Sequence, residues 1–246
     1  MRRKERHELK QNELLMLLDR LAIWASSNGR TLRTGSLLAV LAVVVVGGIH
    51  VYQRGRQQEA ETLLAEAMAV YHGVVRENTV ISGPDDGPTF ESAEARYGSA
   101  VEAFQKVESQ FGSLPQGREA RYYLALSKAG LGEVEQAQAL LEDVIRKRGD
   151  LLYYLASQTL ATVKAERGDH AGAAELYRAL LDDPQVPLPK DQLLFSMAQQ
   201  LEEDGKLEEA RQAYLRFLEE YPQSLLRSQA EQRSELLEYR LSASPA

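Results

Sequence analysis

The chain has 246 residues, of which 29 are Lys or Arg and 36 are Asp or Glu, so its formal net charge is −7. It contains no cysteine, which excludes a disulfide framework, a Cys-ligated zinc or iron–sulfur site, a thiol nucleophile and a lipid-modified cysteine. The acidic balance argues against a general nucleic-acid binder, because such proteins usually carry a basic surplus. We therefore expect no nucleic-acid partner.

Residues 1–34 form a basic segment, with eight Lys or Arg against four Asp or Glu. Five apolar residues of this segment fall on one stripe of a helix: Leu14, Leu17, Leu18, Leu21 and Trp24. A short basic amphipathic helix of this kind typically lies on the inner face of a membrane, with Trp at the level of the headgroups. The alternative is that the stripe docks onto the cytoplasmic surface of a membrane partner.

The next segment, Gly35–Gln53, contains no Asp, Glu, Lys or Arg. As a helix it would be about 28 Å long, which matches the hydrocarbon core of a lipid bilayer. We therefore predict a single transmembrane helix over residues 35–53. The alternatives are a buried core helix and a cleaved signal peptide, but 34 residues precede the apolar stretch and no A-x-A cleavage site follows it.

The flanking charges predict the orientation of this helix. Loops rich in Lys and Arg stay on the cytoplasmic side of a membrane, so the N-terminus is expected in the cytoplasm. Residues 54–246 would then form one exported domain.

Three stretches of the exported part repeat around a turn glycine, namely Gly132, Gly168 and Gly205, which are spaced 36 and 37 residues apart. Alanine stands seven residues before and five residues after each glycine, and Leu or Tyr stands nine residues after it. These matching positions are Ala125, Ala161 and Ala198, then Ala137, Ala173 and Ala210, then Leu141, Tyr177 and Tyr214. Glycine permits the positive φ that ends a helix, the alanines let two antiparallel helices cross closely, and Pro222 stops the last helix.

This pattern resembles the tetratricopeptide repeat, a helix–turn–helix unit of about 34 residues. A degenerate first unit is expected from a helix over Gln57 to about Val75 and a second helix around Phe104, with a long loop at Glu77–Phe90 between them. A capping helix is expected over Ser224–Leu241, with Leu225, Leu226, Ala230, Leu236 and Leu237 as its apolar residues. The predicted fold is therefore all-α, with one N-terminal transmembrane helix followed by an α-solenoid of about four helix pairs and a cap.

The first helices of such repeats line a concave surface that binds proteins. Counting back from the turn glycines gives the partner-binding candidates Tyr122, Tyr123, Leu126, Gln158, Thr162, Phe195 and Gln199. No Lys, Asn or Arg stands at these positions, so a grip on the C-terminal carboxylate of a partner is not expected. The aromatic residues either anchor a partner or pack between neighbouring units.

The sequence shows no constellation of residues for catalysis or metal binding. The four histidines lack a second ligand at the spacing that a metal site needs, and no Ser or Asp is placed as an activated nucleophile. We therefore predict a non-enzymatic protein without metal, cofactor or small-molecule substrate; a hydrolase would need an ordered polar pocket that the sequence does not suggest. His170 is interpreted as a solvated turn residue, and Glu202–Asp204 as a solvated helix face.

The order of the parts, with a basic N-terminus, one uncharged span and exported repeats that end near Tyr221–Ser224, resembles the YfgM-like ancillary subunits of the SecYEG translocon. This resemblance implies a bacterial inner-membrane protein whose periplasmic domain hands emerging chains from the export channel to periplasmic chaperones. The loop at Glu77–Phe90 and the proline-rich stretch Asp182–Asp191 depart from the family pattern.

Two hypotheses for the function follow. The first is an adaptor that sits in the lipid bilayer and binds translocon subunits and periplasmic chaperones. The second is a fixed structural or assembly subunit of another bacterial inner-membrane complex, which should bury a large apolar interface.

Overall fold

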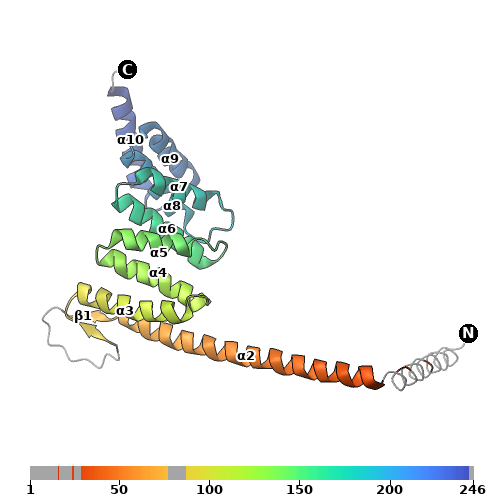
Figure 1. The fold of residues 1–246 in the computed structure, drawn as a ribbon. Helices are drawn as coiled ribbons and strands as arrows, with labels where there is room; N and C mark the ends of the chain where they lie inside the picture. The colour runs from red at the N-terminus through yellow and green to blue at the C-terminus, as the bar shows by residue number, and fades with distance from the viewer. Residues whose placement is uncertain (1–15, 17–23, 25–28, 77–86, 244–246) are drawn as a thin grey trace, which may run out of the picture. The chain divides into compact units, whose positions relative to one another are not determined.

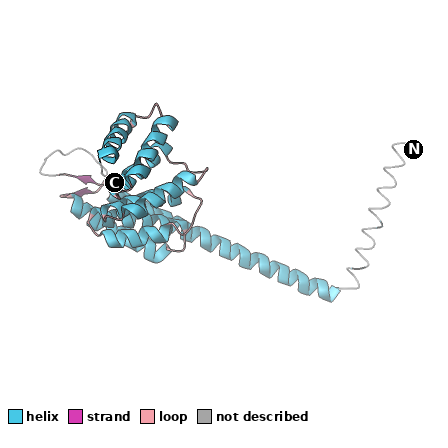
Figure 2. Cartoon of the chain, turned by 90° about the horizontal axis from the view of Figure 1, so that it is seen from above, coloured by secondary structure: helices cyan, strands magenta, loops and turns pink. Residues whose placement is uncertain are grey.

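We describe the protein from a computed structural model, which describes Met16, Trp24 and residues 29–76 and 87–243. The chain divides into two compact units, Met1–Gln58 and Glu59–Ala246. Helices make up nearly all of the described chain (Figure 2). The all-α prediction is therefore confirmed, with one small exception described below.

The first unit is described mainly through α2, a helix of 43 residues that runs from Gly29 to Tyr71 and whose last residues belong to the second unit. Residues 35–53 lie within α2. The large apolar side chains described in this stretch are all exposed: Leu41, Val43, Val44, Val45, Val46, Ile49, Val51 and Tyr52. Among the described residues, no helix is both long and apolar enough to cross a bilayer, so the predicted transmembrane helix is not confirmed.

The predicted amphipathic stripe falls mostly on residues outside the described part of the chain. Leu14, Leu17, Leu18 and Leu21 belong to the residues that are not described. Trp24 is described and is 56% exposed, so the assignment of this stripe to a membrane face stays a prediction.

The second unit stacks α3 to α10 in chain order (Figure 1). Each predicted repeat is a pair of helices, and the end of α2 with α3 (Ala93–Phe111) forms the first pair. The others are α4 (Pro115–Gly130) with α5 (Val134–Val144), α6 (Leu151–Glu166) with α7 (His170–Asp182), and α8 (Lys190–Glu203) with α9 (Leu207–Glu220). The last helix, α10 (Arg227–Ala243), follows as the cap. The prediction of about four pairs and a cap is therefore confirmed.

The glycines and alanines that define the repeat have the backbone conformation and the burial that their spacing predicts. Gly132, Gly168 and Gly205 have φ values of 77°, 81° and 78°, the left-handed region that glycine enters without a Cβ penalty. The alanines five residues later, Ala137, Ala173 and Ala210, are fully buried where the paired helices cross. A larger side chain at these alanine positions would overpack the crossing.

Apolar side chains of successive helices bury one another in three clusters. The first joins the end of α2 to α3 and α4, the second joins α4, α5 and α6, and the third joins α6 to α10. Tyr214, Phe104, Phe217 and Leu141 are among the largest fully buried side chains. Stacking of this kind stabilises each helix pair through its neighbours, as in other solenoids.

A pair of two-residue strands was not predicted from the sequence. Strand β1 (Val74–Val75) runs parallel to β2 (Thr89–Phe90), with Val74 opposite Thr89. Gly73 precedes β1, and a Cβ there would come within 2.4 Å of the Phe90 ring and 2.7 Å of the Pro88 carbonyl oxygen. Because Thr89 and Phe90 belong to β2, the last two residues of the predicted loop Glu77–Phe90 are in a strand. Residues 77–86 of this loop lie outside the described part of the chain.

The capping helix begins at Arg227, three residues later than predicted. Its buried residues are Ala230, Ser234 and Leu237, which share one face through spacings of four and three. Of the apolar residues expected in the cap, Leu225 is 98% exposed and Leu236 is 39% exposed, so neither belongs to this face. The apolar character of these two leucines therefore does not indicate which face of the cap is buried.

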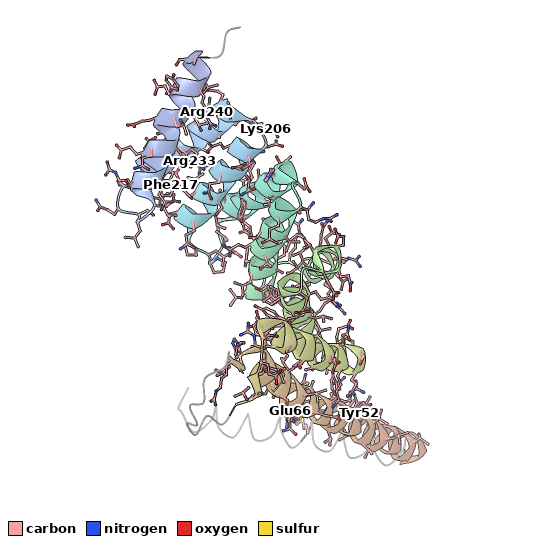
Figure 3. The ribbon with its side chains drawn as sticks, turned by 90° about the vertical axis from the view of Figure 1, so that its left-hand side faces the viewer. Tyr52, Glu66, Lys206, Phe217, Arg233 and Arg240 are labelled. Carbon is pink, nitrogen blue, oxygen red and sulfur yellow. The ribbon has the colours of Figure 1, made fainter. Side chains whose placement is uncertain are left out.

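Two polar residues that were interpreted as solvated take part in the packing. Glu202 is only 9% exposed: the Tyr214 hydroxyl donates to its Oε2 at 3.4 Å, and Nη1 atoms of Arg233 and Arg240 lie 3.4 and 3.7 Å from its Oε1. Both arginines come from α10 (Figure 3). Glu202 therefore joins α8 to α9 and to the cap.

His170 is likewise not a free turn residue. Its Nδ1 lies 2.9 Å from Oε1 of Gln200, and because an amide oxygen can only accept, the imidazole donates this hydrogen bond. The bond links α7 to α8, so His170 contributes to the contact between two successive helix pairs.

Candidate partner-binding site

A pocket of about 420 Å³ lies between α4 and α6, the first helices of two successive repeats. Its walls come from the first half of each helix and from the connection before α6. The residues that line it are Pro115, Arg118, Glu119, Tyr122, Tyr123, Lys147, Asp150, Leu151, Leu152 and Leu155. Its lining thus combines six apolar or aromatic residues with four charged ones, and apolar walls with a few polar groups are typical of a binding site.

Arg118 fixes one wall of this pocket. Its Nε and Nη2 donate to the carbonyl oxygen of Val144 at 3.0 and 2.8 Å, and Nη2 also donates to that of Lys147 at 2.8 Å. Its Nη1 pairs with Asp150 Oδ2 at 2.5 Å. The guanidinium thus satisfies carbonyl groups at the end of α5 and joins them to the start of α6.

Asp150 serves α6 as its N-cap. Its Oδ1 accepts a hydrogen bond from the backbone N–H of Tyr153 at 2.9 Å, which satisfies one of the free donors of the first turn. Burial opposes ionisation of this carboxyl, but the hydrogen bonds from Arg118 and Tyr153, together with the nearby charges of Arg118 and Lys147, hold its pKa below the ordinary value. Asp150 is therefore an anion at neutral pH that is already paired within the stack.

Tyrosine and leucine side chains also line the pocket. The Tyr122 hydroxyl lies 3.3 Å from Thr159 Oγ1, and because Thr159 donates its own proton to the Leu155 carbonyl, Tyr122 is the donor. The Tyr123 ring stacks on Phe104 with 5.5 Å between ring centroids. Leu151 stands at the edge and is 58% exposed, so an apolar surface faces solvent beside the pocket.

The charges of α4 and α6 are unequally paired. All four of their cations pair with acids of the stack, Arg118 with Asp150, Arg121 with Glu108 and Asp143, Lys128 with Glu133, and Lys164 with Asp169. The only acids of the two helices are Glu119 and Glu166. Within the described part of the chain, no hydrogen bond or ion pair engages either glutamate, and Glu119 lines the pocket.

The structure brings two of the seven predicted binding residues to this pocket, Tyr122 and Tyr123. Tyr122 and Phe195 are 9% and 5% exposed, so both pack within the stack, as the second interpretation of these aromatic residues held. Leu126, Gln158 and Gln199 are half-buried, and Thr162 is exposed. The role of these residues in binding a partner stays a prediction.

The charged residues of the pocket were not predicted from the sequence. A signal for Glu119 was present, because residues 119, 122 and 126 follow helical spacing on one face of the first helix. Asp150 stands just before the apolar start of α6, which is the position of an N-cap. Arg118 could not be found in this way, because its carbonyl partners lie 26 and 29 residues further along the chain.

The described residues contain no group of three or more His, Asp or Glu side chains that could hold a metal ion. Of the charged residues of the pocket, Arg118 and Lys147 pair with Asp150, whereas Glu119 is half-buried and unpaired among the described residues. What the geometry offers is a preformed apolar hollow with an unpaired carboxylate, which suits binding of a protein segment.

A family model described as a tetratricopeptide repeat-like domain matches residues 23–243. The chain therefore belongs to the tetratricopeptide repeat-like domain family, whose repeat fold is typically a non-catalytic scaffold for protein–protein interaction.

Among solved structures, two crystal structures of nearly identical TPR-like repeats from Podosopora anserina are similar to the chain. The first shares 17% identity with a TM-score of 0.48, over 58% of this chain and 77% of that one. The second shares 15% identity with a TM-score of 0.45, over 61% of this chain and 90% of that one. No curated protein sequence matches the chain.

Proposed function

We propose that the repeat domain binds partner proteins and that the pocket between α4 and α6 is its principal binding site. The observation that carries this proposal is the position of the pocket on two successive first helices, with exposed Leu151 beside the half-buried Tyr123. Exposed apolar and aromatic groups at the edge of a preformed hollow are the usual anchors of protein interfaces.

We further propose that α2 anchors this domain in a bacterial inner membrane, with the N-terminus in the cytoplasm and the repeats in the periplasm. The support is the uncharged sequence of residues 35–53, its exposed apolar side chains and the basic flank before it. Alkaline phosphatase joined to the C-terminus should be active in cells, because this enzyme folds only outside the cytoplasm. An active cytoplasmic reporter and an inactive phosphatase at the same position would contradict the proposed orientation.

The partners that we favour are subunits of the protein-export translocon and periplasmic chaperones. The support is the resemblance in the order of the parts to ancillary translocon subunits, together with the binding pocket. A fixed structural subunit of another inner-membrane complex is the second candidate, and it is favoured by the exposed apolar side chains of α2, which a permanent partner could cover.

Purification from membranes in mild detergent, with a tag on the C-terminus, separates the two candidates. An adaptor should recover translocon subunits and chaperones at variable ratios, and salt should weaken the association. Recovery of one different complex at a constant ratio that salt does not change would instead identify a structural subunit.

A further inference from the structure

The pocket between α4 and α6 carries a charge pattern that distinguishes among partners. Its cation Arg118 is saturated by two carbonyl groups and Asp150. Lys147 is exposed and lies 3.9 Å from the same carboxylate. Glu119 is the remaining charged residue of the lining, and no partner for it exists among the described residues. The four charges of the lining therefore sum to zero, and Glu119 is the one that no ion pair or hydrogen bond with the described residues engages.

Glu119 also lies in the part of the pocket where a partner would be held. Tyr123 stands four residues after Glu119 on α4, so the two side chains share one face of the helix. Burial, and then the charge of Glu119, raises the pKa of Tyr123. Leu151 and Leu155 contribute the apolar surface opposite, from α6. One ligand side chain could therefore reach the carboxylate while its neighbour covers the leucines.

The net charge of the second unit has the same sign as the charge of Glu119. Residues 59–246 hold 19 Lys or Arg and 32 Asp or Glu, a net charge of −13. The first helices of the later repeats add Glu166 and Glu203, both exposed. The field of this net charge raises the rate of encounter with a basic partner, and the local pair with Glu119 would fix its register.

We infer that this pocket binds an extended protein segment in which Lys or Arg stands beside a bulky apolar residue, with Glu119 pairing the cation and Leu151 and Leu155 covering the apolar side chain. This inference rests on the proposed function of the pocket and specifies its ligand. It accounts for the unpaired carboxylate, which a neutral or acidic partner would leave desolvated without compensation.

The test uses the full-length protein in mild detergent and three fluorescent synthetic peptides with the same central Leu-Phe pair. The pair is flanked by Lys and Arg in the first peptide, by Ser and Gln in the second and by Glu and Asp in the third. We expect the basic peptide to bind about two to five times more tightly than the neutral one, the ratio that one partly exposed ion pair supplies. The acidic peptide should bind most weakly.

Two substitutions assign this preference to the pocket. Glu119→Gln should remove the advantage of the basic peptide, because the basic peptide loses its ion pair and the neutral peptide no longer desolvates an unpaired carboxylate. Glu219→Gln, which removes an exposed carboxylate of α9 outside the pocket, should change the binding of neither peptide. Leu151→Ser should weaken all three peptides, whereas Leu225→Ser, at a residue 98% exposed outside the pocket, should have no effect.

The other outcomes overturn either this inference or the function on which it rests. Equal binding of the three peptides, preference for the acidic one, or a basic preference that survives Glu119→Gln would overturn the basic ligand and leave the pocket a binding site. Failure of every peptide to bind, or binding that Leu151→Ser does not weaken, would overturn the proposed function itself.

Discussion

Arg118 and Asp150 show how single residues hold the binding site in place. The carboxylate caps α6 and pairs with a guanidinium that also engages the end of α5. The pair is partly screened, because the Asp150 side chain is 38% exposed whereas that of Arg118 is 13% exposed. Its contribution to stability is therefore modest, and its main effect is on the geometry of the pocket wall.

This arrangement predicts a dependence on pH. The folded-state pKa of Asp150 is lowered, so its ionic contribution is present above the ordinary carboxyl pKa and is lost as pH falls through the folded value. Asp150→Asn keeps the cap and removes the charge, and we expect it to cost about 1 kcal/mol at neutral pH. Thermal unfolding followed by circular dichroism should show this difference shrink below about pH 4.

Asp150→Ala supplies the matched comparison, since it removes the cap as well and should cost about 1 kcal/mol more at any pH. A deficit of Asp150→Asn that is the same at neutral and acidic pH would contradict the assignment of its cause to the ion pair with Arg118.

Glu202 is the second residue on which a specific prediction depends. Its side chain is buried, whereas those of its partners Arg233 and Arg240 are 40% and 50% exposed. Water can therefore solvate the arginines if the ion pairs are broken, but the carboxylate would be left buried without a compensating charge. Removal of both cations, by Arg233→Ala with Arg240→Ala, should destabilise the unit by about 3 kcal/mol. Adding Glu202→Gln should recover part of this loss, because a neutral amide costs less to bury.

The measurement is the melting temperature of the double and the triple variant. If the triple variant melts no higher than the double, the loss comes from the packing of the arginine side chains rather than from the uncompensated carboxylate.

At the scale of the helix pair, the crossing of α6 and α7 depends on small residues. Ala173 is fully buried there, whereas Ala179 of the same helix is exposed. Ala173→Trp should therefore overpack the crossing and cost about 1–3 kcal/mol. The same change at Ala179 should leave the free energy of unfolding nearly unaltered, and equal melting temperatures for the two variants would contradict the assigned helix pair.

The helix pairs were predictable because each repeats a local signal. The turn glycines, the crossing alanines and the helix ends depend on backbone sterics and spacing within about 20 residues. The face of α10 was not predictable in the same way, because its leucines are ambiguous by composition and only contact with α9 separates Leu237 from Leu236. The pairing of β1 with β2 likewise depends on Gly73 meeting Phe90, which no periodicity reveals.

At the scale of the whole molecule, the sequence predicted the class of the binding domain but not the chemistry of its site. Tyr122 and Tyr123 were identified from repeat position, and they do line the pocket. That Glu119 is unpaired among the described residues becomes clear only in the structure, where the cations of α4 and α6 pair with other acids. Charge at a site is a balance among residues that are distant in the sequence, so counting charges along the chain could not predict it.

Photo-crosslinking in cells can show whether partner proteins bind at the pocket between α4 and α6. A photoreactive amino acid is placed at Leu151, with Leu225 as the control because it is also exposed but lies outside the pocket. We predict that irradiation joins the Leu151 variant to partner chains, and that adding Glu119→Gln reduces this product. Equal products from both positions, or a product from Leu225 alone, would contradict binding at this pocket.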